Sequence, residues 1–223
     1  MALKSLKTER RRLADDVYQQ ILDAILASDI GMDDQLVQEK LAAELEISRT
    51  PVREALLRLE QEGVLVTSPR GGFMLRRVSE DEAKEIYETR AAIEGQAARL
   101  LAIKNDPADH AHIRAVIERE ENLTTHTVQA YFAANRAIHR VIVERCGNRH
   151  LLEMFDNIWN RAVALHLFAA IDEIDLAESL GAHMQLAQAI ETGDWRIAMP
   201  AVFDHIDDGF TLQARALKAR HGA

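Results

Sequence analysis

The sequence predicts a mostly α-helical protein, with an N-terminal winged helix-turn-helix domain at residues 1–78 and a C-terminal all-α helical bundle at residues 79–223. Two observations carry this prediction. Apolar residues recur with helical spacing over most of the chain. The exception is VLVTSPRGGFMLRRV, Val64–Val78, in which two short apolar runs flank a Pro-Arg-Gly-Gly turn and indicate a β-hairpin.

Composition limits the class of protein. The 223 residues are 48% hydrophobic, which is typical of a globular chain. A single cysteine, Cys146, allows no intramolecular disulfide and no thiolate zinc site, and no apolar run is long enough to cross a bilayer. We therefore expect a cytoplasmic protein that does not enter a membrane.

The net charge of −9 is distributed unevenly. Residues 1–78 hold 12 basic and 13 acidic side chains, whereas residues 79–223 hold 15 and 23. Within the first part the arginines also cluster, so the overall charge does not exclude binding to a phosphate backbone. The distribution indicates a local basic surface on a nearly neutral domain.

Three helices are expected before the hairpin. The first covers Leu13–Ser28 and the second Gln38–Leu45, each with apolar residues at helical spacing. Ser48 is a suitable N-cap for a third helix, Arg49–Gln61, which tolerates Pro51 in its first turn. Two helices, a short turn, a third helix and a hairpin make a winged helix-turn-helix.

The third helix has an apolar face and a polar face. Its apolar stripe consists of Val52, Ala55, Leu56 and Leu59. Arg49, Thr50 and Arg53 fall together on a neighbouring face at the N-terminal end, the part of such a helix that meets bases and phosphates in the DNA major groove. Arg70 at the hairpin tip is expected in an adjacent minor groove or against a phosphate. Arg58 projects elsewhere and is interpreted as solvated.

The segment LEISRTPVREALLRLEQEGVLVTSPRGGFML closely resembles the DNA-binding domain of the GntR family of bacterial transcription regulators, and the likeness runs from about Leu13 to Val78. Some members of that family use an arginine of the second helix on DNA, where this chain has Glu39. The resemblance implies as DNA contacts Arg49, Thr50, Arg53, Arg70 and Gly71.

The second part of the chain shows helical periodicity throughout. Segments such as NDP, CGN and TGD separate its apolar stripes. The expected helices are Glu80–Ile103, Asp109–Leu123, Val128–Arg145, His150–Ala170, Glu173–Glu191 and Trp195–Leu217.

Polar side chains interrupt the inward-facing stripes of this bundle. Asn135 and His139 lie one turn apart, His183 and His205 occupy core positions on later helices, and Arg90 does so on the first. Unpaired burial is costly, so these residues need a shared explanation. Three imidazoles and one side-chain oxygen suit zinc, nickel or a similar divalent ion. Because an arginine nearby would pair with a carboxylate, we predict a metal-assisted pocket for a small organic acid.

The segments YETRAAIEGQAARLLA, NRAIHRVIVERCGN, AHMQLAQAIETGDWRIA and FDHI resemble the FCD ligand-binding domain of the FadR subfamily. In metal-binding members the ligands correspond to Asn135, His139, His183 and His205, with aspartate commoner at the first position. His166 is expected to line the pocket. Surface positions are expected for His110, His112, His126, His150 and His221.

Together these features predict a metabolite-responsive transcription regulator, a repressor that binds an inverted repeat of double-stranded DNA as a symmetric homodimer. Two alternatives stay open. One is a metal-independent sensor of a larger effector such as an acyl-CoA. The other, less favoured, is a helical metallohydrolase, which would need a general base beside the metal, yet the chain has no His-Asp dipeptide.

Overall fold

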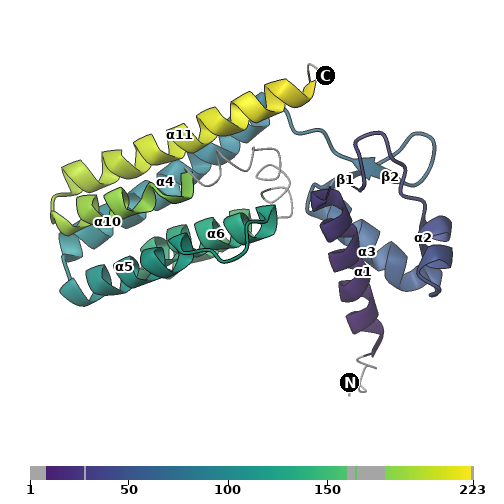
Figure 1. Ribbon diagram of the computed structural model, residues 1–223, viewed down its shortest axis with the longest axis horizontal. Coiled ribbons are helices and arrows are strands. Elements are labelled where there is room, and N and C mark those ends of the chain that lie inside the picture. Colours follow the sequence, from purple (N-terminus) through teal and green to yellow (C-terminus); the bar gives the residue numbers. More distant parts are fainter. Residues whose placement is uncertain (1–8, 28, 160–163, 165–178, 222–223) are drawn as a thin grey trace, which may run out of the picture. The chain divides into compact units, whose positions relative to one another are not determined.

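In a computed structural model of the protein, the described residues are 9–27, 29–159, 164 and 179–221. The chain divides into two compact units, residues 1–77 and 78–223 (Figure 1). The first unit is a winged helix-turn-helix with a short antiparallel wing, and the second is all-helical in its described part. The predicted fold class is confirmed.

The first unit contains α1 (Glu9–Leu26), α2 (Gln38–Glu44) and α3 (Arg49–Gln61). Helix α3 has the predicted limits, and α1 packs against it. Their facing stripes form the core of this unit, with these residues almost inaccessible to water: Val17, Ile21, Val52, Leu56 and Leu59. Burying the apolar side of α3 leaves its arginine-bearing side at the surface.

Two details of the helices differ from the sequence-based expectation. Ser48 does occupy the N-cap position of α3, but its side chain makes no capping hydrogen bond. Arg58 is about half exposed, yet it is not merely solvated, because it pairs with Glu62 and Asp15 and lies over the ring of Tyr18. Arg58 thus joins α1 to the end of α3.

The wing consists of β1 (Leu65–Thr67) paired antiparallel with β2 (Phe73–Leu75). Leu36, which precedes α2, exchanges backbone hydrogen bonds with Phe73 and so adds a third short segment to the hairpin. Gly72 has a φ of +71°, and a Cβ there would lie 2.6 Å from the carbonyl oxygen of Leu36. Glycine therefore allows the wing to approach the chain before α2.

The second unit is a helical bundle whose elements are α4 (Glu80–Lys104), α5 (Pro107–Glu121), α6 (Val128–Arg145), α7 (Arg149–Trp159), α10 (His183–Glu191) and α11 (Trp195–His221). Figure 1 shows the long helices α4 and α11 side by side. Gly95 permits this approach, because a Cβ there would collide with the ring of Phe203. No helix among the described residues has the length and apolarity needed to cross a membrane.

One expected helix of the bundle lies partly outside the described residues, and another needs correction. The helix predicted at His150–Ala170 begins at Arg149 and is described as far as Trp159, beyond which the structure describes Ala164 alone before Ser179. The helix predicted at Glu173–Glu191 is not continuous: Gly181 and Ala182 form a turn, and α10 starts at His183. Glycine is a poor helix former, which explains an interruption at Gly181.

The Gly72→Ala substitution should lower the free energy of unfolding of the first unit by about 1–3 kcal/mol. The methyl group meets the Leu36 carbonyl in a backbone conformation that already disfavours alanine. Urea unfolding should be followed by circular dichroism and by tryptophan fluorescence, since Trp159 and Trp195 both belong to the second unit.

The matched control is Gly71→Ala, because Gly71 also has positive φ, at +89°, but a Cβ there meets nothing within 4 Å. Both substitutions should shift the circular-dichroism curve and leave the fluorescence curve unchanged. The shift should be larger for Gly72→Ala than for Gly71→Ala. Equal effects of the two variants would show that the contact with Leu36 is unimportant for stability.

Candidate DNA-binding face and candidate metal centre

The predicted DNA contacts lie at the surface of the first unit. Arg49 and Arg53 are exposed and Thr50 is partly exposed, all in the first turns of α3. Arg70 and Gly71 are exposed at the turn of the wing. Among the residues that the structure describes, Arg53 has no ion-pair partner, so its guanidinium is available to an external anion such as a phosphate.

Arg49 is held from α2 at two points. The side chain of Gln38 donates a hydrogen bond to the carbonyl oxygen of Arg49 at 3.1 Å. Nη1 of Arg49 donates to Oε1 of Glu39 at 3.2 Å. The sequence indicated the arginine but not these contacts, because they depend on how α2 meets α3 in space.

Three histidines converge in the second unit. Nε2 of His139 on α6 lies 3.2 Å from Nε2 of His183 on α10 and 3.3 Å from Nε2 of His205 on α11. The candidate ligand atoms all lie within 4.8 Å of one another, a spacing compatible with one metal ion. His139 and His183 are almost completely buried. Helices widely separated in sequence thus direct three imidazoles to one point.

The other ring nitrogens show how the imidazoles are oriented. Nδ1 of His183 donates to the carbonyl oxygen of Leu180 at 2.7 Å, which leaves Nε2 without a proton in the neutral ring. Nδ1 of His139 lies 2.5 Å from Oε2 of Glu94. A proton on Nε2 of His139 could form a good hydrogen bond with only one of its two neighbours, Nε2 of His183 or Nε2 of His205. A cation at the centre would bind all three nitrogens, so the arrangement fits a metal ion.

Burial and neighbouring charges set the charge of two of the rings, His183 and His205, and of Glu94. Desolvation, with the adjacent imidazole of His139, lowers the pKa of His183 to about 3 and of His205 to about 2. Both rings are therefore neutral at pH 7, the form that binds metals. Burial alone would raise the pKa of Glu94, but His139 and Arg90 outweigh it and hold that pKa near 2. Glu94 is thus a buried carboxylate anion.

Glu94 connects the histidines to Arg90. Nε of Arg90 donates to Oε1 of Glu94 at 3.0 Å, while the other carboxylate oxygen faces His139. The Arg90 guanidinium carbon also lies 4.4 Å from the centre of the Trp159 ring and 4.9 Å from that of Tyr87. Sequence reasoning missed Glu94, although its place one turn after an inward-facing arginine could have indicated it.

The other predicted site residues are only partly described. Asn135 is buried on α6, one turn before His139. His166 lies outside the described residues. Of the histidines expected at the surface, His112, His126 and His150 are exposed and His110 is half-buried.

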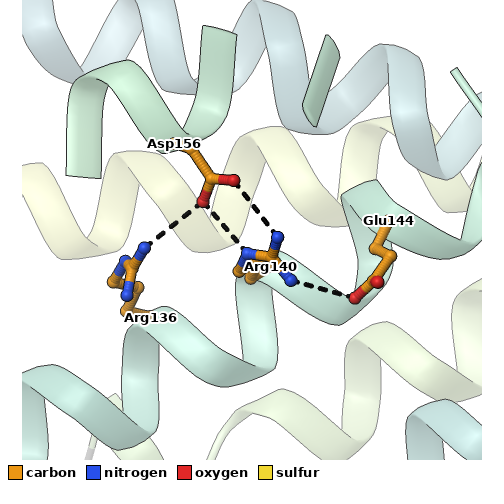
Figure 2. A network of polar contacts seen from close by, with 4 residues as sticks. All are labelled: Arg136, Arg140, Glu144 and Asp156. Carbon is orange, nitrogen blue, oxygen red and sulfur yellow. Dashed lines mark hydrogen bonds and ion pairs between the residues drawn. The ribbon is translucent and has the colours of Figure 1, made fainter. Parts of the chain in front are cut away.

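Helix α7 provides one wall of the histidine cluster. Trp159 stacks on His139, with ring centres 5.9 Å apart and ring planes 25° apart. Figure 2 shows how α7 is fixed to α6: Asp156 accepts two hydrogen bonds from Arg140, at 3.0 and 3.2 Å, and one from Arg136 at 3.3 Å. Arg140 also pairs with Glu144 on its own helix. The bidentate contact orients Asp156 firmly and thereby the last turn of α7.

Two protein families match the chain. The description of the first is "FCD domain", at residues 85–208, and that of the second is "Bacterial regulatory proteins, gntR family", at residues 13–75. The chain is 28% identical to a protein of Paenarthrobacter nicotinovorans, the "Probable D-xylose utilization operon transcriptional repressor", over 92% of this chain and 91% of that protein.

Another relative is the regulator McbR of Escherichia coli, which is 29% identical over 72% of this chain and 74% of that protein. The solved structure of E. coli McbR/YncC covers 91% of this chain and 97% of its own, at 25% identity and a TM-score of 0.62. The relatives therefore share both the DNA-binding unit and the helical unit.

Replacing Asp156 with alanine should lower the free energy of unfolding of the second unit by about 1–2 kcal/mol, because Arg136 and Arg140 are partly buried and lose a shared acceptor. Urea unfolding monitored by tryptophan fluorescence measures this. The control is Glu144→Ala, which removes an exposed partner of the same arginine and should cost a few tenths of a kcal/mol at most. Similar losses for both variants would contradict a special role for Asp156.

Proposed function

Because the chain belongs to the gntR family of bacterial regulatory proteins and carries an FCD domain, we propose that it is a repressor whose operator affinity depends on a small organic acid bound at a divalent metal ion. The chain is a transcription regulator and not an enzyme, since both families and the relatives are regulators. The metallohydrolase alternative is therefore set aside.

The observation that carries the proposal is the convergence of three Nε2 atoms from α6, α10 and α11. Three imidazole ligands suit zinc or nickel and leave coordination positions for a further oxygen. Asn135 is the candidate for a fourth protein ligand, because it lies one turn before His139 on the same helix. Any position left over can accept a carboxylate oxygen of the effector.

Arg90 is the candidate partner for the organic acid. A guanidinium has five N–H donors, and the bond to Glu94 uses the one on Nε. Glu94 contacts both Arg90 and His139, so a change at the metal reaches the arginine through one carboxylate. This connection supports joint recognition of metal and acid. We also propose that His166 lines the pocket, as the resemblance to metal-binding FCD domains implies.

On the DNA side, α3 would lie in the major groove, with Arg49, Thr50 and Arg53 on bases and phosphates. Arg70 and Gly71 of the wing would contact the adjacent backbone or minor groove. A symmetric homodimer would place two such units on an inverted repeat. Coupling of about 1–3 kcal/mol between the effector site and the operator would change DNA affinity roughly 5- to 150-fold.

The Arg53→Ala substitution should weaken operator binding roughly 5- to 150-fold, the loss expected for a base or phosphate contact of about 1–3 kcal/mol, and leave the fold intact. The operator is first obtained by selecting duplexes from a randomised pool with the wild-type chain, and dissociation constants are then measured at fixed salt. Arg119→Ala is the control, because it removes an exposed arginine from the helical unit. Unchanged affinity of Arg53→Ala would refute the assigned recognition face.

Zinc or nickel should raise the thermal midpoint of the chelator-treated chain, and one acid of a panel of small carboxylic acids should raise it further only when metal is present. Glu94→Gln should weaken metal binding about 10- to 100-fold, because it removes the anion beside His139. Glu85→Gln is its control, since Glu85 is exposed on the same helix.

Isothermal titration calorimetry with each metal measures the metal affinities of the wild type and of the Glu94→Gln and Glu85→Gln variants. If neither metals nor small acids change the midpoint, the histidines are structural and the effector is a larger, metal-independent one such as an acyl-CoA. If Glu94→Gln and Glu85→Gln bind metal equally well, Glu94 does not support the site.

A further inference from the structure

The DNA-binding face contains an acidic side chain next to its first arginine. Glu39 on α2 is 56% exposed, and its Oε1 lies 3.2 Å from Nη1 of Arg49, which is 68% exposed. Both charged groups are open to solvent at the N-terminal end of α3. A carboxylate at this place is unexpected, because it repels the phosphates that the neighbouring arginines attract.

Folding stability does not explain this ion pair. Pairs this exposed contribute about 0–1 kcal/mol, since water and salt screen them and two long side chains must be ordered. The core of the first unit is formed instead by the buried stripes of α1 and α3. We therefore consider which hydrogen bonds the Glu39–Arg49 pair can make to a bound molecule.

A cation beside an anion matches the edge of one G·C base pair. In the major groove, guanine presents the acceptors N7 and O6, and its partner cytosine presents the N4 amino group as a donor directly beside O6. Arginine binds the guanine edge and a carboxylate accepts from cytosine N4. The three other base-pair orientations place a donor or a methyl group against the arginine, or an acceptor against the carboxylate.

Resting on the proposed placement of α3 in the major groove, we propose that Glu39 is a specificity-determining residue. Its carboxylate accepts a hydrogen bond from cytosine N4 while Arg49 binds the guanine of the same pair. Gln38 assists, because its bond to the Arg49 carbonyl ties the start of α3 to α2 and keeps the two charged side chains adjacent. One G·C pair in each half of the operator is thereby read in one orientation.

The test compares the full-length wild type with Glu39→Gln and Glu39→Ala by selection of binding sites from a randomised duplex pool, followed by dissociation constants for single-base variants of the selected site. The wild type should require G·C at one position of each half-site. Both variants should reduce discrimination at that position tenfold or more and leave the other positions unchanged.

The matched control is Glu44→Gln, which removes an exposed carboxylate from the same helix. It should keep the wild-type base preferences. Thermal unfolding of all variants confirms that each is folded, as the weak contribution of the Glu39 pair to stability leads us to expect.

The proposal is overturned if the Glu39 variants bind all sequences more tightly by one common factor, with a steeper salt dependence and the same base preferences. Glu39 would then only repel phosphates. A different failure concerns the proposed function itself: in that case the wild type enriches no sequence from the pool, whatever residue stands at position 39.

Discussion

The carboxylate of Glu94 has almost no access to water, and the arrangement of the candidate metal centre depends on it. A buried anion is tolerated only with partners on both oxygens, and here they are Arg90 on one side and His139 on the other. The contact with Nδ1 turns Nε2 of His139 toward the two other imidazoles. Glu94 thus determines both the direction of a candidate ligand and the position of the arginine beside it.

A comparable dependence on a neighbouring helix holds in the first unit. Helix α3 buries one face against α1, which fixes where its arginines emerge, and α2 then determines how Arg49 is presented through Gln38 and Glu39. In the first unit, Gln38 and Glu39 on α2 orient Arg49 on α3. In the second unit, Glu94 on α4 orients His139 on α6 and Arg90 one turn away on its own helix. A substitution at the orienting residue can therefore alter recognition while leaving the fold unchanged.

Features that depend on interactions between residues close in sequence could be predicted, and features that depend on contacts between distant segments could not. The limits of α3 and α6 were predicted correctly because capping, a proline in the first turn and helical periodicity are local signals. The three histidines could be selected because each interrupts an apolar stripe. Trp159 and the Glu39–Arg49 pair could not be, since their importance arises from contacts between helices. Glu94 was missed, although its spacing from Arg90 on the same helix is a local signal. The start of α10 at His183 was not predicted, because helical periodicity does not reveal the turn at Gly181 and Ala182.

The charges at the centre also favour an anionic effector over an apolar one. The rings of His183 and His205 are neutral, and the cationic Arg90 and the anionic Glu94 cancel, so a divalent ion would add a charge of about +2 to a largely buried site. Such a charge is costly to bury without a counterion. A small acid with two carboxylates would neutralise it, whereas an acyl chain would leave it uncompensated. For the proposed metal-bound site, electrostatics therefore favours an anionic ligand over an apolar one.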